Sequence, residues 1–164
     1  MPDIYTDEWY EAVKDAINES AGKLADLPEG SFIVAIEISA DGLSPYVDTS
    51  IGLRRFVVKI ERGTCSWYKE VFSKDEEYDM APGGVNYRFI GPARAFDEIA
   101  GGLLDPVDAA LKGVIRVRGD MRFLMRHAEN VKVLLEAYTR LVQTNWPLGK
   151  PPYLDKTPNE VANA

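Results

Sequence analysis

Cysteine and histidine are almost missing from this sequence of 164 residues, which contains one of each. Cys65 therefore has no partner for a disulfide within the chain. Metal sites that need several cysteine or histidine ligands are excluded for the same reason, because His127 is the single histidine. With 46% hydrophobic and 27% charged residues, the chain can bury a core without such cross-links. We expect neither a metal nor a cofactor.

Long apolar runs are missing as well. The longest, Phe32 to Ile36, has five residues, whereas crossing a bilayer takes roughly 20. The N-terminus carries Asp3, Asp7 and Glu8 where a secretory signal would place Lys or Arg before an apolar stretch. We therefore expect a cytoplasmic protein with no transmembrane segment.

Positive charge is scarce over most of the chain. Nineteen Lys and Arg stand against 26 Asp and Glu, and the net charge of −7 argues against a surface that neutralises the phosphates of nucleic acid. Residues 1–50 hold two basic and eleven acidic residues, whereas residues 112–126 hold five basic residues and one acidic residue. The sequence therefore predicts no nucleic-acid partner and one local positive region.

Four arginines dominate that positive region: Arg116, Arg118, Arg122 and Arg126. They are candidates for contact with an anionic group or with an anionic membrane surface, where each basic residue contributes about 1 kcal/mol. The alternative is that they form ion pairs with acidic neighbours in the same chain. The sequence leaves both interpretations open.

Hydrophobic periodicity predicts a single domain of helices and short strands. Apolar residues three and four apart predict a first helix that begins at Thr6 and ends near Leu27. Alternation from Ser31 to Ile38 predicts the first strand. The later predictions are strands at 55–61, 65–72, 85–90 and 114–118, an irregular loop at 43–53, a solvated break at 74–77, short helices beginning near Pro92 and Pro106, and a last helix at 119–142.

The short links between the early strands favour an α+β fold, in which a five-stranded, mixed but mainly antiparallel sheet is covered on one face by helices. Four prolines among the last twenty residues predict an extended tail. We therefore divide the chain into a domain at 1–144 and a Pro-rich tail at 145–164.

The stretch from Phe96 to Met121 resembles the sterol carrier protein 2 family. Residues 102–106 match a G-x-L-x-P segment of that family, and residues 113–120 match its G-x-I-x-V-x-G-D strand and turn, with a short helix between them. The predicted hairpin with Trp67 and the opening helix with Trp9 also fit, so the resemblance covers roughly residues 6–142. It implies helices that enclose an apolar tunnel for a sterol, an isoprenoid, a fatty acid or a fatty acyl-CoA, and a lipid-binding and lipid-transport function without catalysis. With such a ligand, Arg116, Arg118, Arg122 and Arg126 become candidates for contact with an acidic lipid head group or with a phosphate of coenzyme A.

The apolar residues predicted to face one another across the sheet and helices are the candidate lining of this hydrophobic cavity. From the sheet they are Val34, Ile36, Phe56, Val58, Trp67 and Phe89, and from the helices Phe96, Ile99, Leu103, Met121, Leu124 and Met125. The alternative is that the same residues fill the core, because periodicity does not distinguish a packed interior from a hollow one.

Other functions have weaker support in the sequence. Cys65 is expected to be a small buried residue and His127 a residue at or near the surface. Residues 118–120 form an Arg-Gly-Asp sequence that is expected to be a strand-to-helix turn. We expect no enzyme. The alternative function is a protein-interaction or oligomerisation module with a filled core, accessory to a lipid-pathway enzyme and docking through Trp146 and the tail; a homodimer is left open.

Overall fold

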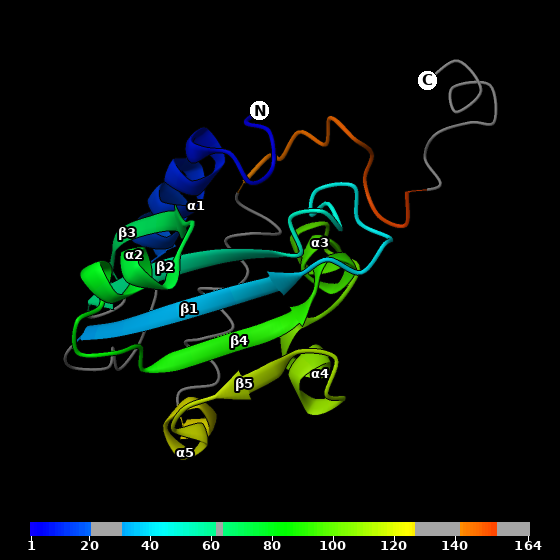
Figure 1. Ribbon diagram of the computed structural model, residues 1–164. Coiled ribbons are helices and arrows are strands. Elements are labelled where there is room, and N and C mark those ends of the chain that lie inside the picture. The colour runs from blue at the N-terminus through cyan, green and yellow to red at the C-terminus, as the bar shows by residue number, and fades with distance from the viewer. Residues whose placement is uncertain (21–30, 62–63, 127–141, 154–164) are drawn as a thin grey trace, which may run out of the picture.

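The structure of the protein is a computed structural model that describes residues 1–20, 31–61, 64–126 and 142–153 (Figure 1). Within these ranges, the helices are α1 (Asp7–Ser20), α2 (Lys74–Met80), α3 (Ala93–Ala100), α4 (Pro106–Leu111) and α5 (Met121–Arg126). The strands are β1 (Ser31–Ser39), β2 (Leu53–Glu61), β3 (Thr64–Val71), β4 (Tyr87–Pro92) and β5 (Arg116–Arg118). The predictions for residues 21–27 and 127–141, including His127, lie outside the described residues.

The five strands form one sheet in the order β3-β2-β1-β4-β5 (Figure 1). β1 and β4 are parallel, and the other neighbouring strands are antiparallel. β2 and β3 form the predicted hairpin, whereas the parallel pair needs a long crossover, which here passes through the hairpin and α2. The predicted α+β fold with a mixed, mainly antiparallel sheet is confirmed.

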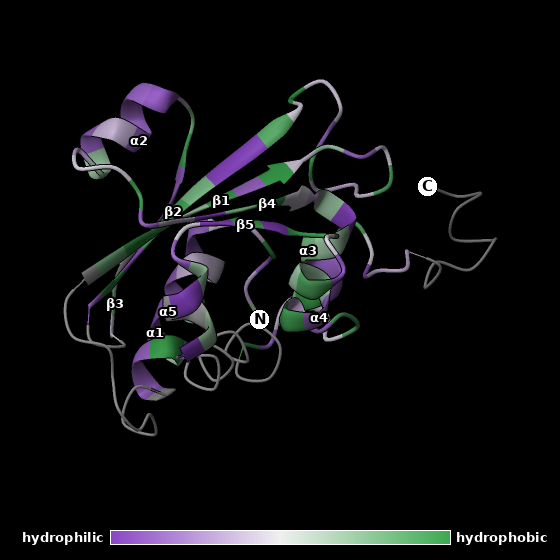
Figure 2. Cartoon of the chain, turned by 90° about the horizontal axis from the view of Figure 1, so that it is seen from below, coloured by the Kyte–Doolittle hydropathy of each residue, from purple (hydrophilic) through white to green (hydrophobic). Residues whose placement is uncertain are grey.

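Alternation along the strands gives the sheet two distinct faces. Val34 and Ile36 of β1 lie opposite Val58 and Phe56 of β2, on the face that we call the inner face. In Figure 2 the helices α1, α3, α4 and α5 lie on this side of the sheet. The opposite, outer face is partly covered by α2, whose Met80 packs against a small buried cluster of outer-face residues.

α1 begins where the sequence predicts. The Thr6 hydroxyl accepts a hydrogen bond from the backbone N–H of Trp9 (3.3 Å), and acidic residues occupy the first turn, where they suit the helix dipole. One side of the helix is buried against the inner face over β2 and β3. Its buried apolar residues are Trp9, Tyr10, Val13, Ala16 and Ile17.

The prediction of a solvated break at 74–77 is wrong, because these residues form the first turn of α2. The Ser73 hydroxyl accepts from the N–H of Glu76 (3.1 Å), and the Glu76 carboxylate accepts from the N–H of Phe72 (2.8 Å). This reciprocal pattern resembles a capping box, which satisfies N–H groups that a helix start leaves free. The serine and glutamate three residues apart are a sequence signal that the prediction missed.

The irregular loop predicted at 43–53 is confirmed up to residue 52, and β2 begins at Leu53. Asp41 holds this loop against the start of α3. Its carboxylate accepts from the N–H groups of Leu43 (2.9 Å) and Ser44 (3.0 Å), and from the N–H of Arg94 in the first turn of α3 (2.8 Å). Pro92, which precedes α3, makes no side-chain cap, so a residue distant in sequence caps this helix.

The short helix α4 follows its sequence signals closely. The Asp105 carboxylate accepts from the N–H groups of Val107 (2.8 Å) and Asp108 (3.1 Å), Pro106 occupies the first helical position, and Gly113 has a left-handed φ of 74°. β5 then covers the last three residues of the strand predicted at 114–118.

A buried carboxylate connects four distant segments of the chain. Asp97 of α3 has 0% exposed surface and accepts hydrogen bonds from the hydroxyls of Tyr5 (2.6 Å), Ser44 (2.5 Å) and Tyr153. Burial raises the pKa of Asp97 above the usual range of aspartate, and the hydroxyl donors offset this effect only in part. The N-terminus, the loop after β1, α3 and the C-terminal segment are therefore held together by one side chain.

Residues 142–153 lie along the N-terminal segment. The indole N–H of Trp9 donates to the Thr144 hydroxyl (2.9 Å), and the N–H of Ile4 donates to the Asn145 carbonyl (3.0 Å). Trp146 is half-buried and packs edge-on against Tyr46, at 5.8 Å between ring centroids. The division of the chain after residue 144 stays a prediction, because residues 154–164 lie outside the described ranges.

We expect the Gly119→Ala variant to be strongly destabilised. Gly119, in the turn between β5 and α5, has a φ of 139°, and an added Cβ would contact the Tyr87 ring and lie 2.6 Å from the Asn86 carbonyl oxygen. The backbone conformation costs about 1–3 kcal/mol for alanine, and the overlap adds about 1–3 kcal/mol. Thermal unfolding would measure the loss. Gly83→Ala is the control, because no atom lies within 4 Å of its added Cβ; equal melting temperatures for the two variants would contradict the prediction.

Candidate functional site

The inner face of the sheet has a filled part and a partly open part. Under α1, the inner-face residues Phe56, Val58 and Tyr68 are fully buried and pack with the aromatic side chains of that helix. Toward the middle of the sheet and on α3, a second group of apolar side chains keeps part of its surface exposed to solvent, although Ile38 of β1 and Tyr87 of β4 are buried. We call this half-buried set the central apolar patch; it comprises Phe32, Val34, Ile36, Ile60, Phe89, Phe96 and Val117.

The central apolar patch includes side chains of β1, where partial exposure of apolar residues is unusual. β1 is the middle strand of the five, and apolar side chains on the covered face of a middle strand are ordinarily buried completely. Phe96 of α3 touches both the cluster under α1 and the smaller cluster around Ile99 and Ile115, so it marks the boundary of the open part. The patch is made of hydrocarbon side chains, and it can therefore bind an apolar group by removing it from water.

The predicted lining residues fall into distinct places in the structure. Val34, Ile36, Phe89 and Phe96 belong to the central apolar patch and pack against the margins of the buried clusters, while Phe56, Val58 and Ile99 are buried within those clusters. Leu103, Met121 and Met125 lie at the surface of the protein. Leu124 belongs to α5 by its backbone, and its side chain is outside the described part of the structure.

The expectation that Trp67 shares a face with Phe56 and Val58 is wrong. Ile60 pairs with Cys65 and Lys59 pairs with Trp67, so β3 has one extra residue, Ser66, between the two pairs. Such a bulge reverses the alternation beyond it. Trp67 therefore points to the outer face, where it packs beside Val57 and Val71.

The four predicted arginines are all exposed. Arg116 and Arg118 lie in register with Ile90 and Arg88 on the outer face of β5, whereas Val117 between them belongs to the central apolar patch. The sheet therefore separates both arginines from a ligand on the inner face. Arg122 and Arg126 lie on α5. The expected contact with a ligand head group is compatible with the α5 pair and not with the β5 pair.

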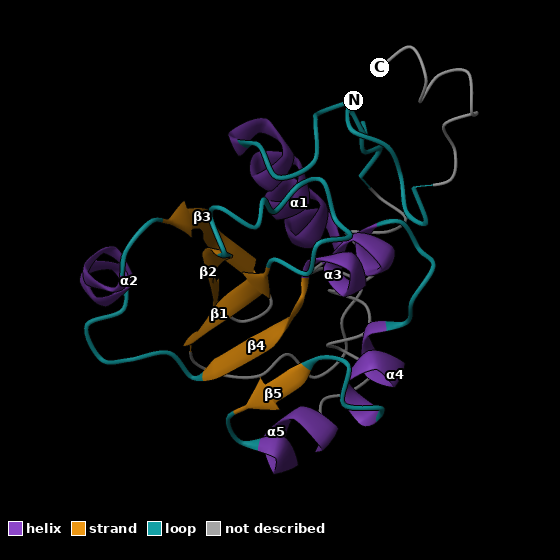
Figure 3. Ribbon diagram, turned by 45° about the vertical axis from the view of Figure 1, so that its right-hand side comes forward, coloured by secondary structure: helices purple, strands orange, loops and turns teal. Residues whose placement is uncertain are grey.

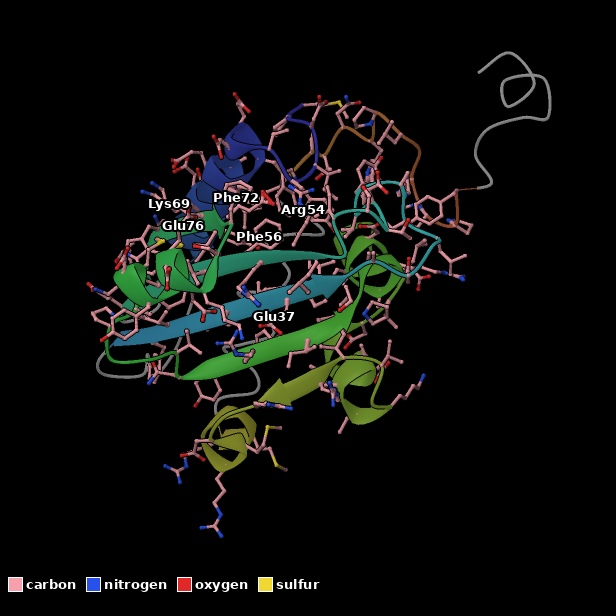
Figure 4. All side chains as sticks on the ribbon, in the orientation of Figure 1. Glu37, Arg54, Phe56, Lys69, Phe72 and Glu76 are labelled. Carbon is pink, nitrogen blue, oxygen red and sulfur yellow. The ribbon has the colours of Figure 1, made fainter. Side chains whose placement is uncertain are left out.

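The other arginines of the described structure are paired. On the inner face, Arg54 binds Glu70 through two nitrogens (2.6 and 3.1 Å). On the outer face, Glu37 accepts from Arg55 (3.3 Å) and Arg88 (2.6 Å). Figure 4 shows Glu37 over β1 and β4, and Phe56 between the sheet and α1. These ion pairs use cations that could otherwise bind an acidic ligand.

Comparison with known proteins identifies the fold. No protein-family model matches the sequence, and no curated protein matches it. A crystal structure of sterol carrier protein 2 superimposes with a TM-score of 0.65, at 20% identity, over 84% of this chain and 98% of that chain. The solution structure of a conserved hypothetical protein from Thermus thermophilus, suggested to be a sterol carrier protein, gives 0.64 at 20% identity, over 88% and 93%. The chain has the sterol carrier protein 2 fold.

The sterol carrier protein 2 fold confirms the family resemblance in its architecture. The structure also shows which members of the central apolar patch the sequence analysis missed: Phe32, Ile60 and Val117. Phe32 and Ile60 share their alternation with residues that were chosen, since Phe32 precedes Val34 by two positions and Ile60 follows Val58 by two. The pattern could have found them.

Reactive groups are few in the described part of this sterol carrier protein 2 fold. Cys65 is buried as expected, and burial raises the pKa of its thiol to about 11. Among residues 1–20, 31–61, 64–126 and 142–153, no three His, Cys, Asp or Glu side chains come together to hold a metal. In the same ranges, no helix has the length and apolar content to span a membrane.

Proposed function

We propose that the protein binds a lipid on its central apolar patch and transfers it without catalysis. The observation that carries this proposal is the apolar surface on the middle strand that stays only half-buried, at Val34 and Ile36. The fold supports it, because one solved structure of this fold is named for carrying sterols. The ligand class is an apolar tail with or without an acidic group: a fatty acid, a fatty acyl-CoA, a sterol or an isoprenoid.

The apolar contact alone is sufficient for useful affinity. A chain of sixteen carbons gains about 0.8 kcal/mol per buried CH₂, or roughly 12 kcal/mol before ordering and association costs. Micromolar binding requires about 8 kcal/mol. A patch that covers most of an alkyl tail therefore needs no ion pair with the ligand, which agrees with the pairing of Arg54 with Glu70.

The burial of Cys65 and Asp97 also supports a carrier without catalysis. The thiolate is the nucleophilic form of cysteine, and burial keeps Cys65 protonated at neutral pH. Asp97 is fully buried, so a bound substrate on the central apolar patch does not reach its carboxylate. Exchange of lipid with a membrane requires only that the apolar tail enter and leave.

The second candidate is a protein-interaction or oligomerisation module with a filled core, accessory to a lipid-pathway enzyme. The dense aromatic packing of Trp9, Tyr10 and Phe56 under α1 favours it. Trp146, the predicted docking residue, is half-buried against Tyr46 and is therefore less available to a partner.

Lipid extraction distinguishes the two functions. The purified protein would be extracted with organic solvent and the extract analysed by mass spectrometry; we expect an acyl or isoprenoid lipid near one molecule per chain. The delipidated protein should then take up a fluorescent fatty acid, and unlabelled fatty acid should compete. A protein that yields no lipid and takes up no fluorescent fatty acid would instead support the filled module.

A further inference from the structure

The edge of the sheet beyond β4 combines exposed apolar side chains with a cluster of basic residues. α4, β5 and α5 form this edge in both Figure 1 and Figure 3. We call residues 111–126 the cationic edge. Large apolar side chains are exposed on it, with Leu111 at 80% and Met125 at 75%, together with Val114 and Met121. Its basic residues are Lys112, Arg116, Arg118, Arg122 and Arg126.

The charge of this edge is opposite to that of the remaining chain. Five basic residues and Asp120 give the edge a net charge of +4, so the total of −7 leaves −11 for all other residues. A dipolar charge distribution of this kind orients a protein with its positive end toward an anionic surface.

The basic side chains of the edge also differ from the other described arginines in their pairing. Every arginine that the structure describes outside the edge binds a carboxylate: Arg54, Arg55, Arg88 and Arg94 pair with Glu70, Glu37, Glu77 and Glu98. Within the described residues, none of the edge's five cations lies within ion-pair distance of a carboxylate. Over the ranges that the structure describes, these cations therefore differ from the paired arginines elsewhere and are exposed to solvent.

We propose that the cationic edge docks the protein on an anionic lipid bilayer. Cations are attracted to acidic head groups, and apolar side chains enter the boundary between head groups and acyl chains. α5 presents both properties, because Met121 and Met125 are four residues apart on one side of the helix and Arg122 and Arg126 are four apart beside them. An acidic protein or a nucleic acid would match the charge but would give no role to exposed Leu111 and Met125.

Docking goes beyond ligand binding, since it does not require an occupied central apolar patch. It places that patch close to the bilayer, because Val117 belongs to the patch and its neighbours Arg116 and Arg118 belong to the edge. Met121 and Met125 thereby act as membrane anchors in place of the cavity lining that the sequence predicts.

Vesicle sedimentation tests the charge requirement. The full chain should bind vesicles of phosphatidylcholine with phosphatidylserine, bind pure phosphatidylcholine vesicles at least tenfold more weakly, and detach as salt rises. The double variant Arg122→Glu, Arg126→Glu should lower the partition coefficient at least tenfold. The control variant Lys69→Glu, Lys74→Glu makes the same change of net charge at exposed residues of β3 and α2 and should bind like the wild type. Equal losses in the two variants would overturn the proposal.

A second pair of substitutions separates a bilayer from another polyanion. Leu111→Ser with Met125→Ser should reduce binding to phosphatidylserine vesicles several-fold while leaving retention on heparin unchanged. If vesicle binding stays at the wild-type level, the partner is a polyanion without an apolar phase and the membrane assignment fails. Uptake of fluorescent fatty acid should remain normal in these variants, so the outcome is independent of the ligand site.

Discussion

The Asp97→Ala variant is expected to lose about 3–6 kcal/mol of unfolding free energy, because the hydroxyls of Tyr5, Ser44 and Tyr153 lose their acceptor and each unsatisfied buried group costs about 1–3 kcal/mol. Tyr153 is half-buried and contributes least. Loss on this scale removes much of the stability of an ordinary domain. Denaturation in urea, followed by fluorescence, measures it. A loss below about 1 kcal/mol would mean that the hydroxyls find other partners.

The Asp97→Asn variant tests the charge of the same side chain. Because burial raises the pKa of Asp97 in the folded protein, the folded state keeps its proton at a higher pH than the unfolded chain. This group's contribution to stability is therefore greatest below the ordinary aspartate pKa of about 3.9 and falls as the pH rises through the folded pKa. Asparagine keeps an acceptor oxygen and should remove that decline. Wild-type and Asp97→Asn stabilities that change in parallel across this pH window would contradict the assignment.

The Ile36→Trp variant is expected to abolish uptake of fluorescent fatty acid while keeping its melting temperature within a few degrees of the wild type. Ile36 is half-buried in the middle of the central apolar patch, so a larger side chain can extend over the patch and occupy the place of the ligand. In a filled core the same substitution would overpack and cost about 1–3 kcal/mol. Fatty-acid titration and thermal unfolding of the same samples give both quantities.

Two further variants of β1 control for this result. Ile36→Glu places a charge on the patch and should lower fatty-acid affinity at least tenfold, which corresponds to about 1.4 kcal/mol. Ile33→Glu is the matched control, because Ile33 is also half-buried, lies on the outer face of the same strand and is paired with Lys59. If the two glutamate variants bind fatty acid equally well, the ligand does not lie on the inner face.

The candidate site was predictable where its information is local. The alternation that places Val34 and Ile36 together also places Phe32 with them, and the caps of α4 follow from Asp105 and Gly113. Trp67 was placed on the wrong face because one inserted residue in β3 reverses the alternation of side chains. The hydrophobic pattern of the sequence does not reveal this bulge. Met121 and Met125 are exposed because of how the rest of the protein packs around α5. The spacing of these two residues in the sequence does not predict that packing.

The sequence by itself determined the strands, their faces where no bulge intervenes, the main helix starts and the uneven charge, because each depends on residues within a few positions of one another. Only the tertiary structure decided which arginines are paired, which apolar side chains stay half-buried, and that Asp97 joins Tyr5, Ser44 and Tyr153, which are 53 to 92 positions away from it. Burial and pairing are properties of neighbours in space, and segments far apart in the chain become neighbours only when the sheet and helices pack.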